Sequence, residues 1–248
     1  MGEDLLKRNN KIWDTLYVEH EEGPLGITYP TEALIVFVSN MNKTRKIEDY
    51  FDDLGAEKSK KLVGKKINAL EIGFGTTANL EFLKSRGWEV TGWEVSQEAC
   101  NRSSTYFLEK KIDIKIDYWS GKNFPAVTKK FDFVVALQSI YYNYEIVTFL
   151  VRLREVLVDG GRVFFSFFSL EHSYANWLKP LDGFEQVFEF TNEHPNQRLH
   201  GSTLFVPRDQ ENLIEVFTSA GYSKIEVFRT ESNVSPLNEI WWYVSAIT

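Results

Sequence analysis

The chain has 248 residues, of which 43% are hydrophobic and 25% charged, and a formal net charge of −7 at pH 7. This composition is typical of a globular protein with a sizeable core, and its acidic balance argues against DNA or RNA as a partner, which would require a basic face. The single cysteine, Cys100, excludes an internal disulfide and a cysteine-rich metal site. The N-terminus lacks a signal-peptide pattern and the longest apolar runs are too short to span a bilayer, so we expect a cytoplasmic protein that does not bind membranes.

The first sixty residues have the pattern of a helix, a turn and a helix. Residues 4–20 carry apolar side chains at helical spacing, and two glycines and two prolines interrupt this pattern over residues 21–30. A second helical stretch starts after Thr31, whose hydroxyl suits an N-cap, and ends near Gly55. We therefore expect residues 1–60 to form an N-terminal helical cap.

From residue 66 onward, strand and helix patterns alternate. Gly87 follows the first of these helices, as expected at a helix C-terminus, and Ser96 suits the N-cap of the second. Five strand units in this alternation predict an open, doubly wound, mostly parallel sheet in an α/β domain over residues 61–248. The predicted strands span residues 66–73, 88–95, 113–117, 131–138 and 162–170, and the predicted helices between them span residues 77–86, 96–111 and 143–157.

The last third of the chain is less regular. Residues 171–206 have mixed polarity and no firm period, whereas a helix over residues 208–220 and strands over residues 222–229 and 239–248 follow them. Two strands joined by a short loop predict a hairpin, so we expect seven strands in the sheet and an antiparallel edge.

The segment LEIGFGTTANLEFL, residues 70–83, places a glycine-rich turn between the first strand and the first helix of the α/β domain. Gly73, Gly75 and Ala78 match the G-x-G-x-x-G/A turn of dinucleotide-binding units, so a nicotinamide nucleotide is one candidate ligand. Glu71 favours a second candidate, because a carboxylate at the tip of a strand suits a ligand with an ammonium group. The amino acid end of S-adenosylmethionine has such a group.

Two further acidic residues follow at the ends of the next strands. Glu94, 21 residues after Gly73, can accept hydrogen bonds from the ribose hydroxyls of either ligand. Asp117 ends the third strand, where its carboxylate can accept a hydrogen bond from the adenine amino group while Tyr118 packs on the ring. Glu71 is therefore the acidic residue that separates the two candidates.

Residues 66–170 resemble the class I S-adenosylmethionine-dependent methyltransferases. The resemblance is carried by five motifs in order, which are ALEIGFGTT, VTGWEVS, IKIDYW, FDFVVALQSIYY and LREVLVDGGRVFFSFF. The tail ENLIEVFTSAGYSKIEVF also resembles this family, whose sheet ends in an antiparallel hairpin. One departure is Thr77, which stands where the family commonly has a third glycine.

The resemblance implies S-adenosylmethionine as the cofactor and a role for each matching residue. The glycine loop holds the amino acid moiety, the end of the second strand holds the ribose, the third strand addresses the adenine, and the fourth ends near the methyl-bearing sulfur. The implied residues are, in that order, Glu71, Gly73, Phe74, Gly75 and Thr76, then Glu94 and Val95, then Asp117 and Tyr118, and last Gln138. Tyr17 and Tyr29, from the helical cap, are expected to wall the methyl donor, with ordinary packing as the alternative.

Methyl transfer from a sulfonium requires alignment above all, and it requires a base only if the acceptor has to lose a proton. His172 follows the fifth strand near the expected mouth of the pocket and is our first candidate for that base, ahead of His194 and His200. The spacing of these histidines fits no zinc pattern, so we assign no metal. Of the two tyrosines that end the fourth strand, Tyr141 and Tyr142, we assign Tyr142 to the site and leave the other to the core.

The family builds a cap over the acceptor after its fifth strand, so the resemblance implies that residues 171–206 form an acceptor-side insertion. Tyr-Pro-Thr-Glu, residues 29–32, resembles sugar- and capsule-precursor methyltransferases, and Arg198 and Lys179 could meet an anionic acceptor. We therefore predict methyl transfer to an oxygen or nitrogen of a small polar metabolite, with a sugar-linked precursor as the first choice. The alternatives are a methyltransferase of secondary metabolites or of a protein, a protein that binds S-adenosylmethionine without catalysis, and a nicotinamide oxidoreductase.

Overall fold

The structure is a computed structural model that describes residues 2–19, 29–43, 66–232 and 238–248. Its helices are α1 (Gly2–Glu19), α2 (Glu32–Lys43), α5 (Ala78–Ser85), α6 (Gln97–Lys110), α7 (Ile146–Leu153) and α8 (Gln210–Ser219). Its strands are β1 (Asn68–Ile72), β2 (Glu89–Glu94), β3 (Lys115–Tyr118), β4 (Phe131–Ala136), β5 (Leu157–Phe168), β6 (Leu178–Pro180), β7 (Val187–Phe190), β8 (Thr203–Phe205), β9 (Ser223–Ser232) and β10 (Glu239–Ile247). Three short 3-10 helices complete it, η2 (Ile140–Tyr142), η3 (Ser173–Trp177) and η4 (Gln197–Leu199).

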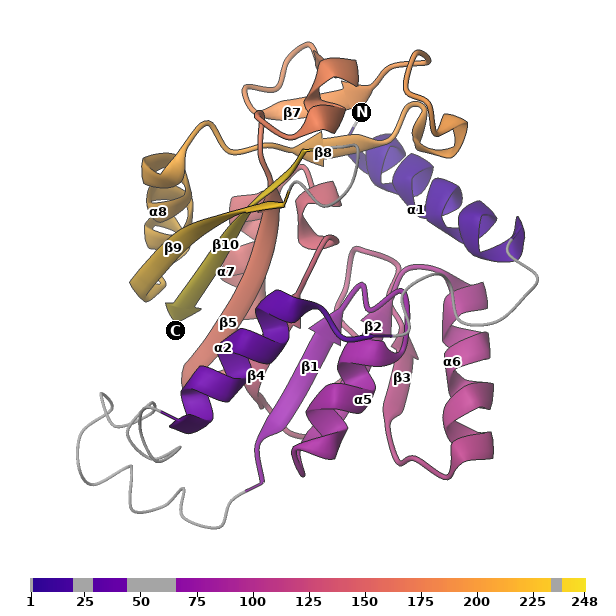
Figure 1. Ribbon diagram of the computed structural model, residues 1–248, viewed down its shortest axis with the longest axis vertical. Coiled ribbons are helices and arrows are strands. Elements are labelled where there is room, and N and C mark those ends of the chain that lie inside the picture. The colour runs from indigo at the N-terminus through magenta and orange to yellow at the C-terminus, as the bar shows by residue number, and fades with distance from the viewer. Residues whose placement is uncertain (1, 20–28, 44–65, 233–237) are drawn as a thin grey trace.

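A seven-stranded sheet in the order β3-β2-β1-β4-β5-β10-β9 forms the centre of the molecule (Figure 1). The first five of these strands pair in parallel, whereas β10 is antiparallel to both β5 and β9. The predicted doubly wound, mostly parallel sheet with an antiparallel C-terminal hairpin is therefore confirmed. The connections change direction between β1 and β4, and sheets of this kind bind ligands outside the carboxyl ends of the strands at such a switch point.

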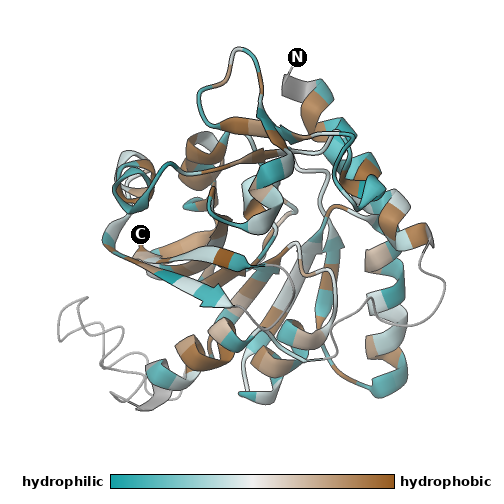
Figure 2. Ribbon diagram, turned by 45° about the horizontal axis from the view of Figure 1, so that its top comes forward, coloured by the Kyte–Doolittle hydropathy of each residue, from teal (hydrophilic) through white to brown (hydrophobic). Residues whose placement is uncertain are grey.

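Helices cover both faces of the sheet, which explains why its central strands are apolar throughout. On one face, α2, α5 and α6 contribute Leu34, Leu80 and Phe107 to a common core cluster. On the other face, α7 and α8 contribute Leu150 and Phe217 to a second cluster. In Figure 2 the hydrophobic colours run along the central strands, while the outer sides of the helices are mostly hydrophilic.

The helix ends follow signals in the sequence. The Ser96 hydroxyl oxygen accepts a hydrogen bond from the Ala99 backbone N–H at 3.2 Å, as predicted for the N-cap of α6. Gly87, with a φ of 83°, ends α5 in the left-handed conformation that glycine adopts readily. The helix predicted over residues 143–157 is shorter in the structure, because a turn closed by the Asn143 side chain precedes α7 and β5 already begins at the end of the predicted range.

Residues 171–206 contain a second sheet of three antiparallel strands in the order β6-β7-β8. Its strands have only three or four residues each, too few to show an alternating pattern in the sequence. The sheet lies beside α1 (Figure 1). Arg8 of α1 forms an ion pair with Glu189 of β7 at 2.6 Å, and the Asn9 side chain both donates to and accepts from the backbone of Thr203 in β8.

The two described N-terminal helices lie in different layers of the molecule. α1 is attached to the small sheet, whereas α2 packs on the large sheet through Leu34 and Val38. The predicted boundary at residue 60 and the predicted helix end near Gly55 lie outside the described residues. None of the helices in the described part of the chain is long and apolar enough to cross a lipid bilayer.

Candidate active site

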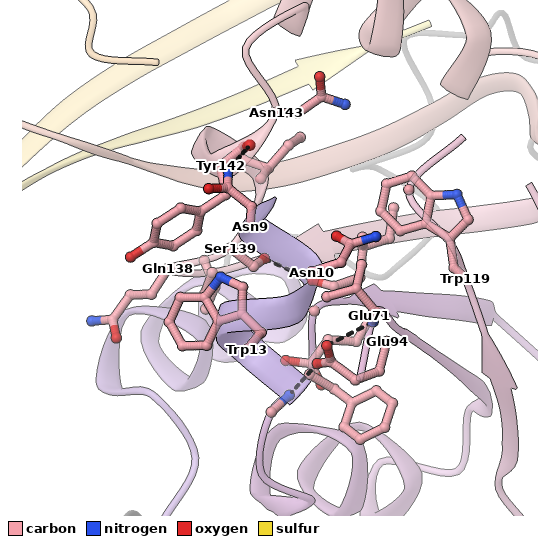
Figure 3. Close-up of a pocket in the computed structure, with 18 of the residues that line it drawn as sticks. Asn9, Asn10, Trp13, Glu71, Glu94, Trp119, Gln138, Ser139, Tyr142 and Asn143 are labelled. Atoms are coloured by element: carbon pink, nitrogen blue, oxygen red, sulfur yellow. Dashed lines mark hydrogen bonds between the residues drawn. The ribbon is translucent and has the colours of Figure 1, made fainter. Parts of the chain in front are cut away.

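A cavity of about 310 Å³ lies at the carboxyl ends of β1, β2 and β4, with α1 along one side (Figure 3). This is the switch point of the sheet, where ligands of this fold are expected. Ten of the predicted site residues line it, namely Tyr29, Glu71, Gly73, Phe74, Gly75, Thr76, Glu94, Val95, Gln138 and Tyr142. The cavity therefore brings together side chains from four separate parts of the chain.

The turn after β1 needs its two glycines. Gly73 and Gly75 have φ angles of 66° and 53°, in the left-handed region that side chains disfavour. A Cβ on Gly73 would overlap Ser139, and one on Gly75 would come within 2.6 Å of the Tyr17 hydroxyl. The two glycines thus let Ser139 and Tyr17 pack directly against the backbone of this turn.

Glu71 points a carboxylate oxygen into the cavity without a partner. Its Oε1 accepts a hydrogen bond from Asn79 Nδ2 at 2.8 Å, while its buried Oε2 has no hydrogen-bond partner among the described residues. Burial raises the pKa of Glu71 to about 8, against the opposing effect of the Asn79 hydrogen bond. A buried carboxylate with one free oxygen suits a ligand that carries a positively charged donor.

Glu94 organises the loops around it. One carboxylate oxygen accepts from the backbone N–H groups of Val95 and Ser96, and the other accepts from that of Gly75 at 3.0 Å. Burial raises the pKa of Glu94, and these three hydrogen bonds oppose the shift. Because a carboxylate has about four acceptor positions, roughly one is left for a ligand hydroxyl.

The structure corrects the expected adenine contacts. Asp117 and Tyr118 do not line the cavity: the Asp117 carboxylate is paired with Lys115 at 2.6 Å, and Tyr118 is largely exposed. The reason is that β3 runs to Tyr118, so the chain turns into the cavity only afterwards, at Trp119 and Gly121, which do line it. The buried Trp119 Nε1 also has no hydrogen-bond partner among the described residues.

The end of β4 has an unusual backbone. Gln138 has a φ of 54°, which is uncommon for a residue other than glycine and is often found at functional sites. Its backbone N–H donates to the Ser166 hydroxyl at 2.7 Å, and the Ser139 hydroxyl donates to the Ile72 carbonyl at 2.7 Å. These bonds fix the backbone at the end of β4, and the Gln138 side chain lies at the cavity (Figure 3).

The two tyrosines after β4 divide as the sequence suggested. Tyr142 lines the cavity and packs edge-on against Trp13 of α1, with ring centroids 4.9 Å apart. Tyr141 is buried in the core, and its hydroxyl is hydrogen-bonded to that of Tyr142. Burial raises the pKa of Tyr142 far above its ordinary value, so its hydroxyl keeps its proton at neutral pH.

His172 does not occupy the position expected of a base, because it lies outside the cavity lining. It is 4% exposed, packs against Phe168 and Trp241, and its Nδ1 accepts from the Tyr174 backbone N–H at 3.0 Å. Burial lowers the pKa of His172 to about 4. It is therefore a neutral residue that caps η3.

The other cap residues named from the sequence lie away from the cavity as well. His194 is buried among aromatic rings, and His200 Nε2 is hydrogen-bonded to its carbonyl at 2.8 Å. Lys179 is paired with Glu189 at 3.1 Å, and Arg198 is not part of the lining. No group of three or more His, Cys, Asp or Glu residues that could hold a metal occurs in the described part of the chain.

One face of α1 contributes more to the site than the sequence predicted. Tyr17 lines the cavity as expected, but Asn9, Asn10 and Trp13 line it as well and were missed, and Asn10 Nδ2 donates to the Ser120 carbonyl at 2.8 Å. The repetition of aromatic and amide side chains on one helical stripe is a signal that could have identified them.

The residues present fit S-adenosylmethionine. The free oxygen of Glu71 and the acceptor position left on Glu94 provide for an ammonium group and a ribose hydroxyl. A nicotinamide dinucleotide has no ammonium group to match the free oxygen of Glu71.

Comparisons with known proteins agree with this geometry. Residues 69–161 match the family model described as a methyltransferase domain. No curated protein matches the chain.

Several solved structures share the fold. An S-adenosylmethionine-dependent methyltransferase from Methanosarcina mazei superposes with a TM-score of 0.56 at 17% identity, over 74% of this chain and 92% of that one. Phosphoethanolamine N-methyltransferase 2 from Haemonchus contortus, in complex with S-adenosyl-L-methionine, superposes with a TM-score of 0.57 at 14% identity. The match covers 86% of this chain but only 60% of that one. The 1,6-didemethyltoxoflavin-N1-methyltransferase from Burkholderia thailandensis superposes with a TM-score of 0.53 at 14% identity, over 92% of both chains.

The matched domain contains the glycine turn and the ends of β1, β2 and β4, which build most of the cavity. The chain therefore contains a methyltransferase domain, and its fold is that of S-adenosylmethionine-dependent methyltransferases of known structure.

Proposed function

We propose that this methyltransferase acts on an oxygen or nitrogen of a small polar metabolite. The observation that carries the proposal is the partly enclosed cavity, which has α1 on one side and a lining rich in aromatic and amide side chains. Pockets of this kind suit a small ligand, with few polar groups that fix its orientation. A sugar-linked precursor stays our first choice of acceptor, because sugars offer both hydroxyl and amino groups.

The cofactor supplies an activated methyl group, and the residues of this chain bind and orient it. In the proposed arrangement, Glu71 Oε2 accepts hydrogen bonds from the ammonium group, and the turn from Gly73 to Thr76 lies beside the amino acid end of the cofactor. Glu94 accepts from the ribose, and Trp119 replaces Asp117 and Tyr118 as the wall beside the adenine.

Methyltransferases of secondary metabolites are the second candidate class. The Burkholderia neighbour, whose name gives a didemethyltoxoflavin as its substrate, covers nearly the whole of this chain. Its identity of 14% supports the fold alone, so a toxoflavin-like acceptor is not proposed here.

A thermal-shift experiment tests the cofactor assignment. S-Adenosylhomocysteine at about 100 times its dissociation constant is expected to raise the melting temperature by about 5–10 °C, and NAD is expected to leave it unchanged. Glu94→Gln should remove most of the shift, because the amide cannot accept the Gly75 N–H and the ribose hydroxyl as a carboxylate does. The matched control is Glu193→Gln on an exposed turn. A shift with NAD alone, or a full shift in Glu94→Gln, would contradict the assignment.

A further inference from the structure

The cavity has two ends with different chemistry. Figure 3 shows Trp119 at one end and Tyr142, Trp13 and Gln138 at the other. In the arrangement proposed above, the adenine would lie at the Trp119 end. We name the other end, formed by Trp13, Gln138 and Tyr142, the acceptor end.

The charges that face the cavity are negative. Glu71 and Glu94 are both part of the lining, and the lining that the structure describes contains no lysine, arginine or histidine. The described lining thus offers no cationic side chain that could pair with an anionic acceptor. The rings of Trp13 and Tyr142 add a preference for a cation, since aromatic faces attract cations.

The acceptor end offers hydrogen bonds without an efficient base. The Tyr142 hydroxyl is fixed by its hydrogen bond to Tyr141 and keeps its proton, so it donates rather than abstracts. The Gln138 backbone is fixed by its left-handed φ and by the bond from its N–H to the Ser166 hydroxyl, and its exposed side chain lies at the cavity. The side-chain carbonyl can accept an N–H and so direct the lone pair of a nitrogen away from itself, toward the methyl group.

We propose that the acceptor is a small amine that lies against the Trp13 and Tyr142 rings, with its N–H on the Gln138 carbonyl. The inference rests on the proposed function and narrows it from oxygen or nitrogen to an amino nitrogen. In the step, the lone pair of the neutral amine forms a bond to the methyl carbon, and the carbon–sulfur bond breaks with its electron pair left on the sulfur. The positive charge passes to the nitrogen, which then releases one proton to water. An amino group on a sugar satisfies the same requirements.

A calorimetric titration tests the proposal with three probes of similar shape, namely benzylamine, benzyl alcohol and benzoate. Each is titrated at pH 8 into the full chain saturated with S-adenosylhomocysteine. We expect benzylamine to bind about tenfold or more tightly than benzoate, because the aromatic rings attract a cation and the described lining has no cationic side chain to pair with an anion. Transfer of labelled methyl from S-adenosylmethionine to benzylamine should rise with pH as the neutral amine becomes more abundant.

The variant Gln138→Asn tests the hydrogen bond that the Gln138 side-chain carbonyl accepts from the amine. Asparagine keeps the amide and tolerates the left-handed conformation, but it withdraws the carbonyl by one methylene group. The affinity for benzylamine should fall about tenfold, the loss expected for one hydrogen bond, while the affinity for S-adenosylhomocysteine is kept. Gln197→Asn, on the exposed helix η4, is the matched control.

Three results would overturn the inference: benzoate binding at least as tightly as benzylamine, no benzylamine binding to the saturated protein, or an unchanged benzylamine affinity in Gln138→Asn. Transfer of labelled methyl to benzyl alcohol but not to benzylamine would also overturn the inference. If S-adenosylhomocysteine itself fails to bind, the proposed function falls together with the inference, whereas binding of S-adenosylhomocysteine with any of the other results leaves the proposed function standing.

Discussion

At the scale of single residues, the site is defined by groups whose environment is unfavourable without a ligand. Glu71 is 1% exposed and leaves one carboxylate oxygen without a partner in the described structure. The buried Trp119 Nε1 likewise has no hydrogen-bond partner among the described residues. Buried polar groups are nearly always hydrogen-bonded, so such exceptions mark places where a ligand completes the network.

The raised pKa of Glu71 leads to a prediction about pH. In the ligand-free protein the folded-state pKa of about 8 lies above the unfolded value of 4.5. The protonated carboxyl therefore stabilises the fold fully below about pH 4.5, and this contribution is lost as pH rises toward 8. Glu71→Gln should raise the melting temperature at pH 8, leave it nearly unchanged at pH 4.5, and weaken S-adenosylhomocysteine binding.

The affinity for S-adenosylhomocysteine should rise with pH, whereas the contribution of Glu71 to the stability of the ligand-free protein falls. Since an ammonium group needs the ionised carboxylate, the affinity of the wild-type protein should increase between pH 6 and about pH 8 relative to that of Glu71→Gln. Calorimetry on both proteins at each pH measures this difference. Parallel affinity curves for the two proteins would show that Glu71 does not hold the ammonium group.

At the scale of elements, α1 builds one side of the site although it lies outside the α/β repeat. Its attachment depends on Asn9, which is 2% exposed. The Asn9 amide donates to the carbonyls of Tyr142 and Thr203 at 3.0 and 2.8 Å, and its oxygen accepts from the Thr203 backbone N–H at 2.9 Å. One side chain thus connects α1, the small sheet and the acceptor end.

Asn9→Ala should therefore destabilise the protein and loosen the site. The loss of three buried hydrogen bonds is expected to cost about 3 kcal/mol in the free energy of unfolding. Urea denaturation measures this change, and weaker S-adenosylhomocysteine binding should accompany it. Asn101→Ala on the exposed side of α6 should change the unfolding free energy by less than about 0.5 kcal/mol. Equal stability of the two variants would refute the role of Asn9.

At the scale of the whole molecule, the sheet could be predicted because its determinants are local. Regular alternation of apolar runs and capped helices, as at Ser96, defines a doubly wound sheet, and the glycine turn defines the edge at which it binds a ligand. Glu71, Glu94 and Gln138 were identified because they end strands or directly follow them. The place of a strand-end residue in the site depends on the order of the strands in the sheet, and the alternation of strands and helices in the sequence predicts that order.

The remaining parts of the site depend on contacts that the pattern does not contain. Asp117 and Tyr118 were assigned to the adenine because β3 was predicted to end one residue early, and a strand end is where sequence boundaries are least certain. His172 was assigned as a base from its place after β5, but the aromatic rings around it come from distant elements such as β10. Asn9 was missed for the same reason, since its partners lie in η2 and β8.

A crystal structure of the protein with S-adenosylhomocysteine tests the central claim most directly. The account predicts the ammonium nitrogen at about 3 Å from Glu71 Oε2, the adenine beside Trp119, and the sulfur facing Gln138 and Tyr142. A complex in which the nucleoside lies away from Glu71, or in which the sulfur faces the Trp119 end, would contradict it.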